Sequence, residues 1–210
     1  MPVTIHKDGP LCGGTLVDIR TDHMSYVFGI NERGVLQHLH WGLPVAGREL
    51  GDRLRPLRYS SFDAELEREM EEYTFWGGAF YGEPGLKVRF ADGVRDLRMK
   101  VTDVLVDADR GRDRLVLTLK DEHYDLTVRL FYRVFPELDL IERHAEAVNG
   151  GSDDIVLEQF LSAAWPLPAC AKYRFTHVAG RWAGEYQLRE TFLSEGKKVL
   201  ESRGGLTGPH

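Results

Sequence analysis

The sequence predicts an all-β fold, a large antiparallel β-sandwich with at most one short helix. From Leu97 onward, apolar and polar residues alternate over one segment after another, which is the period of strands with one buried face. Short turn-forming segments rich in Gly, Asn, Asp and Pro separate these segments. The short spacings favour hairpins and meanders, because a parallel crossover requires a dozen or more residues.

The first strands are predicted to form a hairpin. Residues 24–30 (Met-Ser-Tyr-Val-Phe-Gly-Ile) and 35–41 (Val-Leu-Gln-His-Leu-His-Trp) have the composition of strands, and the segment from Asn31 to Gly34 turns between them. Gly34 accommodates the positive φ that such a turn requires. Residues 42–44 (Gly-Leu-Pro) then end the second strand.

The clearest alternation lies in residues 126–134. Its polar side chains, Thr127, Arg129 and Arg133, share one face, and the other face carries Leu126, Val128, Leu130, Tyr132 and Val134. One buried and one solvated face indicate an antiparallel sheet, and two such sheets would pack their apolar faces together. Further strands are predicted at residues 97–102, 115–119, 140–148, 155–165, 173–179, 185–192 and 197–201.

The one helix that the pattern predicts covers residues 61–73. Leu66, Met70 and Tyr73 recur at helical spacing and would share one face. The same segment is rich in Glu, including Glu71 and Glu72. We interpret these carboxylates as an acidic, solvated helix surface and expect no carboxylate-based site there.

Length and composition predict one domain over residues 1–210, since all-β domains often reach this size. The formal net charge of −6 and the lack of clustered Lys and Arg argue against a nucleic-acid partner. The sequence holds no apolar run long enough for a membrane span and no apolar signal core near its start. Cys12 and Cys170 cannot form a disulfide framework, so we expect free thiols and a cytoplasmic protein.

A histidine pair, His38 and His40, is the first candidate site. Residues two apart on a strand project to the same face, where two imidazoles can bind one metal ion. A cupin-like metal protein would also need a carboxylate four or five residues after the second histidine, and Glu49 comes too late for that. Metal binding is therefore disfavoured, and a polar sheet face, a histidine pair at a site rim, and sugar or interface contacts remain open.

Aromatic side chains form the second candidate site. Residues 73–81 contain Trp76, Phe80 and Tyr81 beside two glycines, which predicts a loop, and Trp41 ends the predicted hairpin. Aromatic faces stack on sugars and also anchor protein interfaces. The alternative is that the loop covers one end of the sandwich and that Trp41 and Trp182 pack in the core or at a corner.

Signatures of catalysis are absent from the sequence. A glycoside hydrolase needs two carboxylates at a defined separation, and composition alone selects no pair among the 33 Asp and Glu residues. No Gly-x-Ser-x-Gly motif, phosphate-binding loop or dinucleotide-binding glycine pattern is present. We therefore assign no catalytic residue, no metal ligand and no cofactor.

Several motifs in order resemble the N-terminal β-domain of family 36 glycoside hydrolases, the α-galactosidases. Residues 25–28 with 34–42 resemble the family's opening hairpin, with Trp41 where the family usually has Tyr, and Glu72-Tyr73 with Gly77 resembles its Glu-Tyr-Pro…Gly stretch. Residues 126–135, 139–143 and 149–150 are similar to its Leu-x-Tyr-x-Val-Phe…Ile-x-Arg…Asn-x-Gly ladder. Residues 180–185 resemble its Gly-x-Trp-x-x-Glu turn, and 201–207 resemble the segment before its catalytic barrel. Residues 78–82 (Gly-Ala-Phe-Tyr-Gly) depart from its usual Gly-Asp-Phe-Arg.

This resemblance implies a galactose-mutarotase-like supersandwich and an α-galactosidase parent. In that family the two catalytic aspartates of a retaining mechanism lie in a downstream (β/α)8 barrel, which is absent here, so the chain alone is expected to be inactive. The resemblance also implies a homo-oligomeric parent acting on α-galactosides, in which His38, His40, Trp41, Trp76, Phe80 and Tyr81 would contact a subunit or edge the active site. A stand-alone mutarotase-like epimerase and a carbohydrate-binding β-domain are the alternatives.

Overall fold

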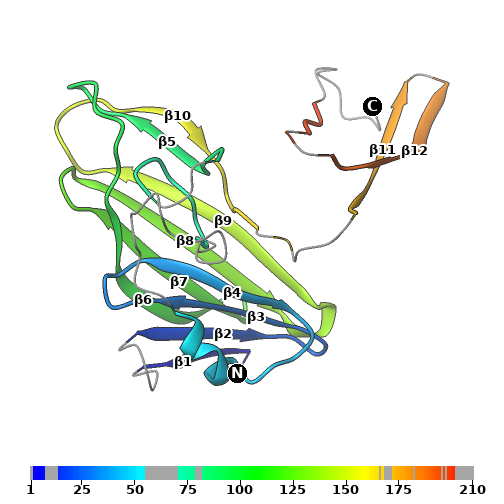
Figure 1. Cartoon of the computed structure of the whole chain (residues 1–210), viewed down its shortest axis with the longest axis horizontal. Helices are drawn as coiled ribbons and strands as arrows, with labels where there is room; N and C mark the ends of the chain where they lie inside the picture. Colours follow the sequence, from blue (N-terminus) through cyan, green and yellow to red (C-terminus); the bar gives the residue numbers. More distant parts are fainter. Residues whose placement is uncertain are drawn as a thin grey trace. The chain divides into compact units, whose positions relative to one another are not determined.

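The computed structural model describes residues 2–7, 14–54, 71–78, 82–165, 167, 172–181, 183–194, 196 and 198–201. The chain forms two compact units, Met1–Pro166 and Leu167–His210, which are described separately. The prediction of one domain over residues 1–210 stays a prediction. Nearly all regular structure is antiparallel β-sheet, as predicted, and Figure 1 shows the strands of each unit.

The first unit contains two four-stranded antiparallel sheets (Figure 1). One sheet has the order β1-β2-β3-β4, formed by Val3–His6, Thr15–Arg20, Ser25–Ile30 and Leu36–Gly42. The other has the order β6-β7-β8-β9, formed by Met99–Asp109, Arg112–Asp121, Leu126–Phe135 and Leu140–Asn149. In both sheets every neighbour in space is also a neighbour in sequence, so both are meanders, as the short turns predict.

The two sheets pack face to face around one apolar core. Phe28 on β3 stacks on Tyr132 on β8, with ring centroids 5.3 Å apart. The predicted alternation on β8 is confirmed, because Leu126, Val128, Leu130, Tyr132 and Val134 are all buried and belong to this core. Aligned antiparallel sheets with alternating inward side chains define a β-sandwich.

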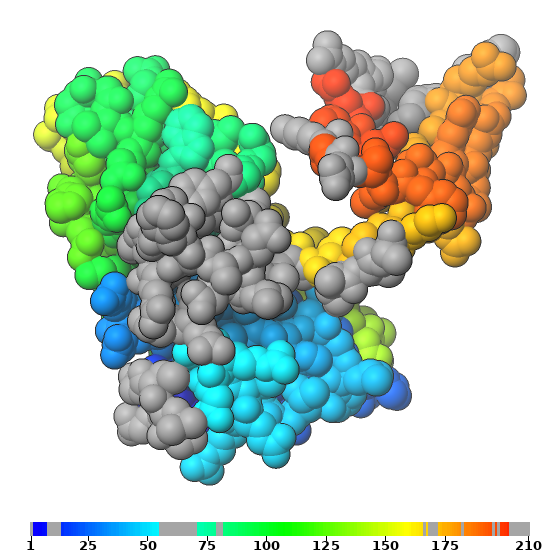
Figure 2. Space-filling model, viewed as in Figure 1, coloured from blue at the N-terminus to red at the C-terminus, as the bar shows by residue number. Residues whose placement is uncertain are grey.

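A two-stranded sheet of β5 (Leu86–Arg89) and β10 (Val156–Phe160) adds Leu86 and Val88 to the same core. A 3-10 segment, η1 (Gly47–Arg53), covers the other face of the first sheet and lies on the surface of the unit (cyan in Figure 2). Leu54 follows η1 and is buried against Gly29 of β3. A Cβ on residue 29 would lie 2.4 Å from a methyl carbon of Leu54, so this contact requires glycine.

One tight turn joins distant parts of the first unit. Asp139 has φ 49° and follows the short 3-10 segment η3 (Pro136–Leu138) between β8 and β9. Its carboxylate accepts hydrogen bonds from the Thr21 hydroxyl at 2.7 Å and the His23 amide at 2.8 Å, in the turn between β2 and β3. These contacts, with the His23 ring, lower the pKa of Asp139 to about 2.

The second unit is built on one hairpin, β11 (Arg174–Arg181) and β12 (Gly184–Phe192). Its turn places Ala183 at φ 61°, in the left-handed region. Val178, Leu188 and Phe192 are each more than half exposed. A two-stranded hairpin with exposed apolar side chains is marginal by itself.

Some predicted boundaries were wrong. Three strands, β1, β2 and β5, were not predicted, and residues 161–165 and 198–201 do not form strands. The predicted helix lies mostly outside the described residues, but its last three positions, 71–73, are not helical. Glu71 instead makes an isolated antiparallel bridge to Gln37 of β4, and residues 72 and 73 form a bend. Among the described residues, no helix has the length and apolar character needed to cross a membrane.

The loss of stability when a leucine is truncated to alanine should depend on how deeply that leucine is buried. Leu117 at the centre of β7 is fully buried, whereas Leu105 on neighbouring β6 is 49% exposed. Leu117→Ala should lower the free energy of unfolding by about 2–5 kcal/mol, because it removes buried methyl groups and leaves a cavity. Leu105→Ala, the matched control, should cost less than about 1 kcal/mol. Urea unfolding measures both, and equal losses would contradict the sandwich arrangement.

Candidate functional site

A buried carboxylate, that of Glu72, lies between the two sheets of the first unit. Glu72 comes from the segment after η1 and is fully buried. Its neighbours are Tyr26 on β3, His38 on β4, Tyr132 on β8 and Arg143 on β9. We call these five residues the Glu72 cluster. Each of the four neighbours comes from a different strand, so the cluster links both sheets to one connecting segment.

Both oxygens of Glu72 are occupied. Oε1 accepts from the hydroxyls of Tyr26 at 2.7 Å and Tyr132 at 2.8 Å and lies 3.0 Å from Nη1 of Arg143. Oε2 lies 3.0 Å from Nδ1 of His38 and 2.8 Å from the Tyr26 hydroxyl. Arg143 also donates to the hydroxyls of Tyr26 and Tyr132, at 3.1 and 3.0 Å. The charged pair is therefore surrounded by further hydrogen-bonding groups, as a buried ion pair requires.

The electrostatics of the cluster keep Glu72 ionised. Burial alone would raise the pKa of Glu72, but the charge of Arg143 and the hydrogen bonds from His38 and Tyr26 bring it below its ordinary value. Burial and the Glu72 charge raise the pKa of Tyr26 and of Tyr132, so both phenols stay protonated and donate. The pKa of Arg143 is raised despite its burial, by Tyr132 and Glu72.

His38 and His40 do not share a face, which contradicts the expectation from their spacing. Cross-strand partners project to the same face, and the register pairs Phe28 with His38, but Val27 with His40. The register therefore shifts by one residue between the two histidines, as in a β-bulge. His38 binds Glu72 in the interior, and His40 Nε2 lies 2.9 Å from the Leu43 carbonyl oxygen.

The bulge instead places Trp41 on the same face as His38. Tyr26 contacts both rings, with centroid distances of 5.0 Å to His38 and 6.2 Å to Trp41. Trp41 is 37% exposed and meets Trp165, which is 53% exposed, at 6.2 Å. An exposed pair of indoles thus borders the buried Glu72 cluster, and we call it the tryptophan pair.

The other aromatic candidates lie apart or outside the described residues. Trp76 contacts a different set of side chains, with Lys87 Nζ 5.2 Å and the Arg95 guanidinium carbon 5.5 Å from its ring centroid. Phe80, Tyr81 and Trp182 fall outside the described residues. The structure therefore brings together His38 and Trp41 but not His40 or Trp76.

Glu72 was wrongly predicted to lie on a solvated acidic surface. Leu66, Met70 and Tyr73 suggested a helix in this segment, and nothing in the local sequence shows that Glu71 and Glu72 are buried. A signal existed on β9, where Ile141, Arg143 and Ala145 alternate on the inward face. An arginine at an inward position requires a buried anion, and Glu72 is that anion.

The chemistry of the cluster is that of an anchor. A general acid needs a raised pKa and access to the substrate, and Glu72 has a lowered pKa and no exposed surface. Among the described residues, no group of three or more His, Cys, Asp or Glu is arranged to hold a metal ion. The cluster fixes Glu72 between the sheets, and its Tyr26 packs against the ring of Trp41.

Comparison with known proteins gives the class. Residues 34–210 match the glycosyl hydrolase family 36 N-terminal domain, so the chain belongs to this family. Among curated relatives it is 26% identical to the α-galactosidase AgaA of Geobacillus stearothermophilus, over 89% of this chain and 29% of AgaA. It is 28% identical to probable α-galactosidase G of Aspergillus terreus, over 92% of this chain and 28% of that protein.

Solved structures agree on the fold. AgaA of G. stearothermophilus, with 1-deoxygalactonojirimycin, superimposes with a TM-score of 0.77 at 21% identity, over 90% of this chain and 29% of that chain. AgaB of the same organism superimposes with a TM-score of 0.75 at 22% identity, over 97% of this chain and 30% of that chain. The chain thus spans less than a third of the length of these relatives and corresponds to their N-terminal domain.

The cluster predicts how stability depends on pH. Glu72→Gln should lower the free energy of unfolding at neutral pH by about 3 kcal/mol, because Arg143 is left buried without a countercharge. The pKa of Glu72 in the folded state lies below its ordinary value of 4.5. The stabilisation is therefore present above that value and is lost as the pH falls through the lowered pKa. The difference between the wild type and the variant should shrink in acid.

Urea unfolding at a series of pH values, followed by tryptophan fluorescence, measures this difference. Glu146→Gln is the control, because Glu146 is half exposed and 3.8 Å from Arg129. It should cost less than about 0.5 kcal/mol at neutral pH. A Glu72→Gln loss that stays constant or grows in acid would contradict an ionised Glu72.

Proposed function

We propose that this chain serves as the N-terminal lobe of an α-galactosidase that cleaves terminal α-galactosides. The observation that carries the proposal is the family match over residues 34–210, combined with a span of under a third of the relatives' length. AgaA has been solved with raffinose and with stachyose, which supports α-galactosides as the substrate class. The reacting carboxylates would belong to a barrel that follows this lobe.

The lobe would act as a scaffold. The Glu72 cluster holds its carboxylate ionised and enclosed, which suits a fixed support and not proton transfer. The hairpin of β11 and β12 supports the same proposal, since Val178, Leu188 and Phe192 are more than half exposed. Such side chains gain by packing against another part of a larger enzyme.

The tryptophan pair is the surface that we propose for contact within the assembled enzyme. Trp41 and Trp165 present large apolar faces at the border of a rigid cluster, and such anchors suit subunit interfaces and the rims of sugar sites. We propose a homo-oligomer of the full-length enzyme on this basis, in which the ring of Tyr26 packs against both His38 and Trp41. The sequence has two cysteines, too few for a disulfide framework, and this supports the cytosol as the location that we propose.

Activity on a chromogenic α-galactoside tests the proposal. The 210-residue chain should show no turnover above the uncatalysed rate, because its described carboxylates form no acid and nucleophile pair that we can assign. The same lobe joined to the catalytic barrel of a family 36 enzyme should hydrolyse the substrate. Turnover by the chain alone, with far-UV circular dichroism confirming that it is folded, would overturn the proposal. Inactivity of the longer polypeptide would do the same.

A further inference from the structure

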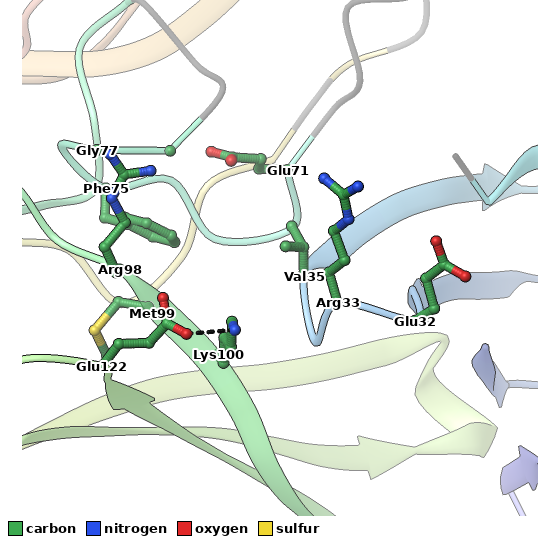
Figure 3. A pocket seen from close by; sticks show the side chains of 11 residues that line it. Glu32, Arg33, Val35, Glu71, Phe75, Gly77, Arg98, Met99, Lys100 and Glu122 are labelled. Carbon is green, nitrogen blue, oxygen red and sulfur yellow. Dashed lines mark ion pairs between the residues drawn. The ribbon is translucent and has the colours of Figure 1, made fainter. Parts of the chain in front are cut away.

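A hollow of about 390 Å³ opens in the first unit, lined by residues outside the Glu72 cluster. Four segments form its wall: the turn between β3 and β4, residues 71–78, residues 98–100 at the start of β6, and Glu122, which directly follows β7. Figure 3 shows the charged side chains that these segments contribute. They are Arg33, Arg98, Lys100, Glu32, Glu71 and Glu122.

The hollow is held open by backbone contacts between its walls. The Val101 amide donates to the Gly34 carbonyl oxygen at 2.9 Å, and the Leu97 amide donates to that of Trp76 at 2.8 Å. These bonds join β6 and the residue two positions before it to the β3–β4 turn and to residues 71–78. The pocket is thus formed by the fold and does not require a ligand to assemble it.

Two glycines give the wall its shape. Gly77 has φ 100°, and a Cβ there would lie 2.2 Å from the Leu97 carbonyl oxygen. A Cβ on Gly78 would lie 2.6 Å from Oε1 of Glu71, so the absence of a side chain at residue 78 is what leaves room for that carboxylate. Glu71 itself is almost fully buried.

The charges lining the hollow balance. Three cationic side chains offer hydrogen-bond donors and three carboxylates offer acceptors, and Lys100 forms an ion pair with Glu122 (Figure 3). An anionic ligand would be repelled by the three carboxylates, and a cationic ligand would be repelled by the three cationic side chains. A neutral ligand with many hydroxyl groups can use both sets, since each hydroxyl donates and accepts.

Three apolar side chains complete the lining, those of Val35, Phe75 and Met99. Phe75 and Met99 belong to the buried core and border the hollow. Sugars combine hydroxyl edges with C–H faces that pack on apolar and aromatic surfaces. The volume also falls in the range of about 300–1,000 Å³ that is typical of small-molecule sites.

We propose that this hollow binds a neutral sugar, with Arg98 and Lys100 donating to its hydroxyls and Glu32 and Glu71 accepting from them. The proposed function gives this lobe no ligand of its own, so the inference goes beyond it. Binding is a property of the 210-residue chain alone and needs no barrel. Failure of this proposal therefore leaves the activity test unaffected.

Amide chemical shifts of the isotopically labelled chain, titrated with D-galactose and D-glucose, test the proposal. We expect saturable shifts at residues 31–35, 75–78 and 98–100 with at least one of the two hexoses. Glycerol, which has hydroxyls but no ring, should shift these amides far less. Inorganic phosphate should not compete. No saturable shift with either hexose, shifts confined to other residues, or displacement by phosphate would each overturn the proposal.

Variants locate the site. Gly78→Ala should weaken binding about tenfold or more, because the new methyl group displaces the Glu71 carboxylate. Gly151→Ala is the matched control, since its Cβ would have only an ordinary contact at 3.5 Å with Asn149, and it should leave the affinity unchanged. If Gly78→Ala unfolds the chain, Arg98→Gln replaces a half-exposed guanidinium and should weaken binding similarly. Equal affinities for the wild type and the folded variants would overturn the assignment.

Discussion

The ion pair of Glu72 and Arg143 is the interaction on which the arrangement of the first unit depends. A buried carboxylate is costly unless a countercharge and hydrogen-bond donors surround it. Here Arg143 supplies the countercharge, and Tyr26, His38 and Tyr132 supply the donors. Because these partners stand on four different strands of two sheets, only one placement of residue 72 satisfies all of them. Apolar packing alone would hold the sheets together without specifying that placement.

Two surface features depend on the same segment. Glu71, Phe75, Gly77 and Gly78 line the charge-balanced hollow, so the position of residues 71–78 determines its shape. On the other side, Tyr26 contacts Trp41, and Trp41 contacts Trp165. A single buried network therefore orients both the proposed sugar pocket and the tryptophan pair. Both belong to a chain that matches the N-terminal domain of this family and spans less than a third of the curated relatives' length.

The sequence predicted the second sheet and the hairpin of β3 and β4, because the residues that indicate strands and turns lie within each segment, but it did not predict β1, β2 and β5. Residues 126–134 show this most clearly, since the side chains predicted to face inward are buried. The prediction failed where a side chain's position depends on an irregular register or on a residue far away in the sequence. Because the register shifts within β4, Trp41 and not His40 lies on the same face as His38. No local sequence pattern predicts this shift. Glu72 was hidden among exposed-looking carboxylates, since its burial depends on Arg143, 71 positions later in the chain. The order of the motifs still identified the protein family, because these motifs are distributed over nearly the whole chain.

A double-mutant cycle on Glu72 and Arg143 tests the central interaction most directly. Urea unfolding would give the free energies of the wild type, Glu72→Leu, Arg143→Met and the double variant. Each single variant leaves one charge buried, and the double variant leaves none. The double variant should therefore be more stable than the sum of the two losses predicts, by about 1–3 kcal/mol. Losses that add to within about 0.5 kcal/mol would show that the two groups do not depend on each other, and would contradict this account.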